Sequence, residues 1–359
     1  MLTKKFRKYK MKLYTKDVQR GYFLMTKLRV GVIGCGRISV RHLIPLTQIE
    51  EVELVACCDI KPDRADAAAK EHGIKAYYSY EEMIESEKLD VVHLCLPHYL
   101  HSKVAIYAFE HGVNVLTEKP MDIDLESAEK AVAVAKEKNL LFGVIFQCRY
   151  TKPAQLVKKA VESGKLGKII SARSVLTWNR SDDYYSSSDW KGTWDKEGGG
   201  VVIDQAIHSI DLVNWVVDSE VESISCSMHN RGHKKVNVED TAEGLITYKN
   251  GTKYGFYCMN NYAADEPIEI RLICENGKVT FGYHDALITY NDGTQEDAHE
   301  EQVKKADGGK DYWGSWHIRQ IRQYYNALLG KEPLELSGEE ALKIHKLIME
   351  IYNQGGMKK

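Results

Sequence analysis

The sequence has no apolar run of the roughly 18 residues that a membrane-spanning helix needs. It also has little net charge, with 49 Lys and Arg against 51 Asp and Glu. This balance argues against a dedicated nucleic-acid binder, which usually carries a basic excess. None of the eight cysteines forms a CxxC pair. We therefore expect free thiols in a cytoplasmic protein, without a disulfide framework, a structural zinc site, or a membrane or nucleic-acid partner.

What the chain does have is enough apolar residue to bury a core. Its 359 residues are 43% hydrophobic and 28% charged, and this length suggests two domains. The first 26 residues stand apart, because eight of the first twenty are Lys or Arg and no apolar stretch of a secretory signal follows. We expect residues 1–26 to be a flexible basic extension, with Met25 as a plausible natural start. A basic arm that touches membranes or nucleic acid is the alternative.

Short apolar runs alternate with helical stretches between residues 27 and 148. The runs lie at 28–34, 52–60, 90–97, 113–120 and 140–147. Each suits a strand buried on both faces of a parallel sheet. Helix signals separate them: Pro62 and Gly73 bound one stretch, and Ser79 lies three residues before Glu82, as in a capping box. The alternation predicts a doubly wound Rossmann domain at 27–148.

Residues 149–359 show a different pattern. A helical stretch at 153–164 is followed by β-rich segments in which Asn250-Gly251, Asn276-Gly277 and Asp292-Gly293 mark turns. Asn-Gly between apolar runs predicts tight hairpins of type I′. From 316 to 354 the chain is helical again. We predict a C-terminal α+β domain with a large, mostly antiparallel open sheet, whose last helices pack back on the Rossmann domain.

A glycine-rich motif follows the first apolar run, with the sequence Gly34-Cys35-Gly36-Arg37-Ile38-Ser39. It fits G-x-G-x-x-[G/A] with Ser in the last place. The first glycine would allow a tight turn, and the second would let the backbone approach a pyrophosphate at a helix N-terminus. Asp59 ends the second run, where its carboxylate can bind both ribose hydroxyls and would repel a 2′-phosphate. The pattern predicts NAD rather than NADP. The alternative is a glycine-rich turn beside a surface aspartate.

Two clusters suggest chemistry. Lys119 lies in the tripeptide EKP at 118–120, at the end of the fourth run, where a parallel strand points into the ligand crevice. Its ammonium can bind a substrate hydroxyl and stabilise an alkoxide. Asp204, His208 and Asp211 follow three glycines at spacings of four and three, so they share one helix face. A histidine beside a carboxylate is the usual general-base arrangement. A solvated lysine, a half-buried histidine and a zinc site are the alternatives.

Two further groups of residues are candidates. The first ends or follows the third apolar run and consists of Leu96, Pro97, His98 and His101. We expect one histidine to line the nicotinamide pocket and the other to begin a helix, with metal ligation as the alternative. The second group precedes the Asp204 helix and is aromatic: Tyr184, Tyr185, Trp190 and Trp194. Such rings suit stacking on a sugar, and packing at a subunit interface is the alternative.

In this order, GCGRIS, Asp59, EKP and GGGVVIDQAIHSIDL resemble the Gfo/Idh/MocA family of sugar and cyclitol oxidoreductases, from about residue 27 to the end. The resemblance implies a Rossmann domain and an α/β domain whose open sheet face makes a homo-oligomer interface. It implies that Lys119 orients the reacting hydroxyl, that His208 takes its proton as hydride moves to nicotinamide, and that Asp204 orients substrate or base. It also implies that Glu118 and Pro120 shape the nicotinamide pocket, with Gln147 and Arg149 at its edge, where Arg149 also reaches substrate.

One position departs from the family, since Ala206 stands where many members have Gly. The segment YYSSSDWKGTWDKEGGG also resembles the branch that oxidises the C3 hydroxyl of hexopyranosides. We therefore expect an NAD-dependent dehydrogenase that converts a secondary hydroxyl of a sugar, glycoside or cyclitol to a ketone. One alternative is redox-assisted glycoside cleavage with tightly held NAD. Another is a non-catalytic sugar-sensing regulator, against which the presence of Lys119 and His208 argues.

Overall fold

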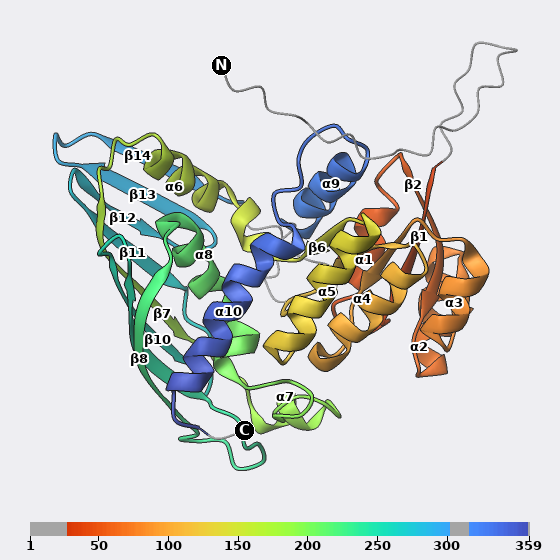
Figure 1. Ribbon diagram of the computed structural model, residues 1–359. Coiled ribbons are helices and arrows are strands. Elements are labelled where there is room, and N and C mark those ends of the chain that lie inside the picture. The colour runs from red at the N-terminus through yellow and green to blue at the C-terminus, as the bar shows by residue number, and fades with distance from the viewer. Residues whose placement is uncertain (1–26, 302–315, 358–359) are drawn as a thin grey trace, which may run out of the picture.

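The computed structural model describes residues 27–301 and 316–357. The basic extension at 1–26, with Met25, lies outside the described residues. Two β-sheets lie side by side, each with helices packed on it (Figure 1). No helix in the described part of the chain is both long and apolar enough to cross a membrane.

The first sheet has six parallel strands in the order β3-β2-β1-β4-β5-β6, which confirms the predicted Rossmann topology. The strands are β1 (Leu28–Ile33), β2 (Val52–Cys58), β3 (Lys75–Tyr77), β4 (Val91–Leu94), β5 (Asn114–Thr117) and β6 (Phe142–Val144). Five of them fall in the predicted apolar runs. β3 was not predicted, because it has three residues, none of them fully buried, and so no apolar run marks it.

Helices connect these strands as a doubly wound sheet requires. They are α1 (Val40–Leu46), α2 (Pro62–His72), α3 (Tyr80–Glu87), α4 (His101–Glu110), which follows the short helix η1 (His98–Leu100), and α5 (Leu125–Lys138). The predicted capping signals are present. The Ser79 hydroxyl accepts a hydrogen bond from the Glu82 amide, and Gly73 ends α2 in the left-handed conformation with φ of 67°.

The second sheet has eight strands in the order β14-β13-β12-β11-β7-β10-β9-β8, and only β7 and β10 pair in parallel. The strands are β7 (Ile169–Thr177), β8 (Val221–His229), β9 (Thr241–Tyr248), β10 (Lys253–Met259), β11 (Glu269–Cys274), β12 (Gly277–Phe281), β13 (Asp285–Tyr290) and β14 (Gln295–His299). One face is covered by α6 (Lys152–Glu162), α8 (Ile207–Val217) and α10 (Gly338–Gln354), and no helix of the described residues covers the other (Figure 1). The predicted large, mostly antiparallel open sheet is confirmed.

The hairpins are present, but the predicted type I′ turns are wrong. A type I′ turn needs positive φ at both central residues. Gly251 has φ of 90°, whereas Asn250 is not left-handed. Neither Asn276 nor Gly277 is left-handed, because Gly277 is already the first residue of β12 and pairs with Cys274. The Asn-Gly dipeptides mark where the chain turns, but the strands extend further than the pattern indicates.

The end of the chain packs against both sheets. α9 (Trp316–Leu328) contacts α1 and the short helix η2 (Gln147–Tyr150), while α10 contacts α5, α8, β6 and β8. Just before α10, Ser337 forms a β-bridge with Gly143 of β6. α10 and Ser337 therefore lie at the β6 edge of the six-stranded sheet, whereas α9 packs beside α1 on one face of that sheet.

Candidate active site

A cavity of about 680 Å³ opens at the carboxyl ends of β1, β2, β4 and β5 and is also lined by residues between 178 and 208. Strand ends at a topological switch point are where open α/β sheets bind ligands. The wall brings together most of the predicted site residues: Gly34, Gly36, Arg37, Ile38, Asp59, Leu96, Pro97, His98, Glu118, Lys119, Gln147, Tyr184, Trp190, Asp204 and His208.

The glycine motif leaves room for a dinucleotide. Gly34 has φ of 94°, and a Cβ there would lie 2.3 Å from the carbonyl oxygen of Cys95, so only glycine fits. A Cβ on Gly36 would meet nothing closer than the Arg64 guanidinium at 3.9 Å, so its backbone is open to the cavity. Asp59 is fixed by the amides of Cys35 and Lys61, which donate to Oδ2 at 2.9 Å and to Oδ1 at 2.8 Å. These residues fit the pyrophosphate and ribose of NAD.

Lys119 and Asp204 meet at the centre of the cavity wall. The Lys119 ammonium donates to the backbone oxygen of Asp204 at 2.6 Å and to its Oδ1 at 3.1 Å. Asp204 lies in η3 (Val202–Ala206), a π-helical turn that leads into α8, and His208 follows in α8 itself. π-turns inside helices are frequent at functional sites. The two predicted motifs, 85 residues apart, are therefore in direct contact.

Asp204 also binds a second lysine that the sequence pattern did not single out. Lys191 donates to Asp204 Oδ2 at 2.9 Å and to Glu197 Oε1 at 3.3 Å, and the Tyr184 hydroxyl donates to Asp204 Oδ2 at 3.0 Å. Burial alone would raise the pKa of Asp204, but Lys191 and Lys119 hold it well below its usual range. Asp204 is therefore a permanent anion that positions other groups.

His208 is neutral in this environment. Burial, followed by the positive charge of Lys119, lowers its pKa to about 3. Its Nδ1 is buried and has no hydrogen-bond partner among the described residues, and the residue lines the cavity, where its ring can meet a ligand. His98 lies nearby, with Nδ1 paired to the Glu197 carbonyl oxygen at 2.8 Å and its ring 4.8 Å from that of Trp190.

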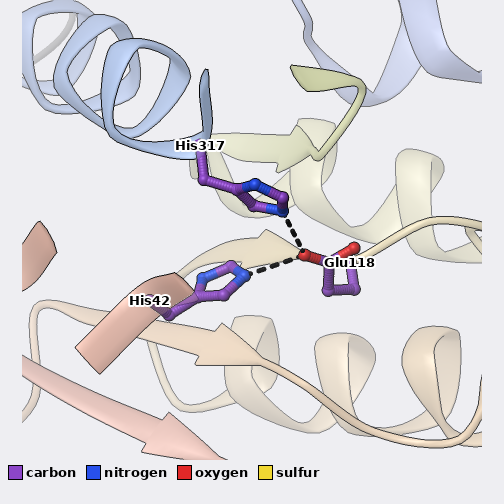
Figure 2. Close-up of side chains that lie close together, drawn as sticks. All are labelled: His42, Glu118 and His317. Atoms are coloured by element: carbon purple, nitrogen blue, oxygen red, sulfur yellow. Dashed lines mark hydrogen bonds and ion pairs between the residues drawn. The ribbon is translucent and has the colours of Figure 1, made fainter. Parts of the chain in front are cut away.

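Glu118 joins a buried group behind Lys119 (Figure 2). His42 Nε2 from α1 and His317 Nε2 from α9 lie 3.0 Å and 3.1 Å from Glu118 Oε1. Burial would raise the pKa of Glu118, but hydrogen bonds from His317 and His42 hold it well below its usual range. The three ligand atoms lie within 4.8 Å of one another, a spacing that would also suit a metal ion. Sequence reasoning did not predict the two histidines.

Six residues that the sequence analysis singled out do not line the cavity: His101, Pro120, Arg149, Tyr185, Trp194 and Asp211. His101 pairs with the backbone oxygens of Pro120 at 2.6 Å and Leu96 at 2.9 Å, and so braces the cavity wall from behind. The Trp194 indole donates to the Asn237 carbonyl oxygen at 3.0 Å. Arg149 is buried and binds Asp211 at 2.9 Å, because a buried guanidinium requires a counter-charge. Asp211 is thereby removed from the predicted catalytic face.

Comparisons with known proteins agree on one family. Residues 28–146 match the family model of oxidoreductases with an NAD-binding Rossmann fold, and residues 154–280 match the GFO/IDH/MocA C-terminal domain. Myo-inositol 2-dehydrogenase of Thermotoga maritima is 28% identical over 228 residues, which cover 62% of this chain but just under two thirds, 66%, of that enzyme. D-glucoside 3-dehydrogenase of Escherichia coli is 26% identical over 349 residues, which cover 90% of this chain and 94% of that enzyme.

A solved structure supports the same assignment. The WlbA dehydrogenase of Bordetella pertussis, in complex with NADH and UDP-GlcNAcA, superimposes with a TM-score of 0.82 at 29% identity. The match covers 91% of this chain and 95% of that one. Together with the glycine cradle and the Lys119–Asp204 contact, these matches show that the chain belongs to the Gfo/Idh/MocA family of NAD-binding oxidoreductases.

Proposed function

We propose that the protein is an NAD-dependent dehydrogenase that oxidises a secondary hydroxyl of a sugar, glycoside or cyclitol to a ketone, with C3 of a hexopyranoside as the preferred position. The observation that carries this proposal is the contact of Lys119 with Asp204, beside neutral His208, in the cavity beyond the glycine motif. The C3 position is supported by the similarity to D-glucoside 3-dehydrogenase, which extends over 90% of this chain.

Lys119 binds and polarises the reacting hydroxyl. Two of its three N–H groups point to Asp204, so the third is available to a substrate oxygen in the cavity. Asp204 fixes the ammonium from two sides, through its backbone oxygen and its carboxylate. A donor held in place before the reaction stabilises the negative charge that develops on oxygen. NAD supplies the hydride acceptor when it is bound.

His208 takes the hydroxyl proton at Nε2. A base with a pKa of about 3 is weak, but it is present almost entirely in its neutral, proton-accepting form. A hydroxyl becomes strongly acidic as its carbon loses hydride, so a weak base suffices when the proton leaves late. Tyr184 and Trp190 line the same cavity and offer aromatic surface to a sugar ring.

Two features bear on the setting of the protein. All eight cysteines are free thiols, which supports the cytoplasmic location that we propose. The open face of the eight-stranded sheet presents the exposed side chains of Leu245, Ile273 and Leu287. Exposed apolar patches favour association, so we propose a homo-oligomer formed through this sheet. Light scattering after size-exclusion chromatography tests it, and a monomeric mass would refute it.

The enzymatic proposal is tested by absorbance of reduced nicotinamide. The purified protein is mixed with NAD or NADP and a panel of glycosides, nucleotide sugars, free hexoses and inositols. We expect NADH formation that Lys119→Ala abolishes, whereas Lys130→Ala, on the exposed side of α5, leaves it unchanged. Mass analysis of the products separates a keto-sugar from a freed aglycone, which would indicate redox-assisted cleavage. Binding of sugar and NAD without any product would favour a regulator.

A further inference from the structure

The buried carboxylate of Glu118 lies directly before Lys119 in the chain and lines the same cavity. We propose that Glu118, a carboxylate that no lysine or arginine among the described residues contacts, makes this protein favour the oxidised dinucleotide over the reduced one. The inference rests on NAD binding at the cavity and does not depend on which sugar is oxidised.

Two histidine rings form the side-chain hydrogen bonds of Glu118. His42 and His317 both direct Nε2 at the same oxygen, Oε1 (Figure 2). In the tautomers that carry a proton on Nε2, both rings donate, and an ionised carboxylate accepts both N–H groups. Glu118 is 6% exposed, so these two donors stand in for most of the water that would otherwise solvate the charge.

The histidines can do this while neutral. His42 Nδ1 lies 2.8 Å from His93 Nδ1, and His93 Nε2 lies 2.9 Å from the Tyr325 hydroxyl. The Tyr325 hydroxyl can donate to His93, which donates to His42, which donates to Glu118, so each neutral ring has one donor and one acceptor in use. Burial lowers the pKa of His93 well below its usual range and also lowers that of His317. The chain therefore solvates the anion without adding a positive charge.

Lys119 and Lys191 of the cavity wall are paired with other carboxylates. The ammonium groups of Lys119 and Lys191 are bound to Asp204, and Lys191 also binds Glu197. Within the described residues, the ion-pair partners of Glu118 are the two histidines alone. No lysine or arginine in the described part of the chain forms an ion pair with Glu118, so its negative charge is not neutralised by direct contact with either.

Glu118 also lies in the half of the sheet where the nicotinamide belongs. Asp59, at the end of β2, binds the adenosine ribose. The rest of the dinucleotide then crosses the switch point between β1 and β4 and extends towards β5. Glu118 directly follows β5 and lines the cavity. The nicotinamide ring carries a positive charge when oxidised and none when reduced, so a fixed anion stabilises the oxidised form selectively.

The expected size of the effect follows from Coulomb's law. At an effective dielectric constant of about 20, two opposite unit charges attract by about 1.4 kcal/mol at roughly 12 Å, which corresponds to about a tenfold change in affinity. The test measures the dissociation constants of NAD⁺ and NADH for the full-length protein by calorimetry, without substrate. For Glu118→Gln we expect NAD⁺ to bind about tenfold more weakly and NADH to bind almost unchanged.

Matched variants separate charge from structure. Glu118→Asp keeps the charge, so the ratio of the two constants should stay within about threefold of the wild-type ratio. Glu87→Gln removes another buried carboxylate, at the end of α3, that is bound to Arg29 and Lys75 outside the cavity, and should leave both constants unchanged. A Glu118→Gln variant that weakens both dinucleotides equally, or neither, overturns the proposal.

Two further measurements keep the proposal falsifiable. If Glu118→Gln does not fold, Gln147→Glu adds a carboxylate to the same wall and should shift the ratio in the opposite direction; an unchanged ratio overturns the proposal. The His42–Glu118–His317 set also resembles a zinc site with two histidines and a glutamate. A stoichiometric divalent metal in the purified protein would cancel the anion and overturn the proposal. None of these failures would affect the dehydrogenase assay, which measures turnover of sugar.

Discussion

The buried imidazole of His208 predicts an unusual dependence of rate on pH. Its pKa is about 3 in the folded protein, against an ordinary value of 6.5. At pH 5 about 1% of His208 would then be protonated, whereas an ordinary histidine would be about 97% protonated. An enzyme that needs neutral His208 should therefore keep nearly constant kcat/KM between pH 5 and 7.5. With an ordinary pKa, kcat/KM would fall about 30-fold over the same range.

The assay is the initial rate of NADH formation at low sugar concentration, since kcat/KM reports groups of the free enzyme. Nuclear magnetic resonance of the histidine rings, with His208→Asn for assignment, gives the pKa directly. If kcat/KM falls with an apparent pKa between 6 and 7, and the His208 ring titrates at the same pH, the reasoning is refuted. A change in kcat/KM near pH 8 would belong to Glu197 instead, whose pKa is raised to about 8 by burial.

The same histidine makes stability depend on pH. The unfolded chain binds the proton near pH 6.5 and the folded chain only near pH 3, so the unfolded chain holds more protons in between. Stability contributed by His208 is therefore complete above pH 6.5 and is lost as the pH falls towards 3, by up to about 5 kcal/mol. In denaturant titrations, His208→Asn should lose about 3 kcal/mol less than the wild type between pH 6.5 and 4.

Three other changes have defined outcomes. Gly34→Ala should abolish dinucleotide binding in calorimetry, because its Cβ would clash with a backbone carbonyl oxygen at 2.3 Å; normal binding would contradict the glycine cradle. Arg149→Met should cost about 3–5 kcal/mol in unfolding free energy, because it strands the buried carboxylate of Asp211, while KM in the folded fraction stays unchanged. Lys191→Met should lower kcat/KM about tenfold or more by loosening Asp204, and Lys191→Arg should recover most of it.

The parts of the fold that could be predicted are those with a strong local signal. The strands β1, β2, β4, β5 and β6 are apolar runs because both faces of a parallel sheet are buried. β3 is three residues long and partly exposed, so its sequence cannot be distinguished from a loop. Asn276-Gly277 indicated a turn, but register across the hairpin is set by pairing with neighbouring strands, which the dipeptide does not encode.

The residues of the candidate site also fall into those that a local motif reveals and those that it does not. Lys119 and Asp204 lie in compact motifs, so each could be proposed from its own segment. Lys191 could not, because the irregular segment around it has no periodicity that shows which side chain turns inward. The histidines that bind Glu118 lie 76 and 199 residues from it along the chain, so only the folded structure brings them together. The sequence did offer one sign that His42 and Lys191 are buried: both stand among aromatic or apolar residues.

The position of the last helices has a consequence for synthesis of the protein. β6 is the edge strand of the six-stranded sheet, and its β-bridge partner Ser337 and the covering helix α10 come from the end of the chain. Roughly 190 residues separate β6 from Ser337, and ribosomes add about 5–20 residues per second. Each new chain therefore carries an uncovered sheet edge for about 10 to 40 seconds, during which chaperones, or neighbouring chains on the same polysome, can reach it.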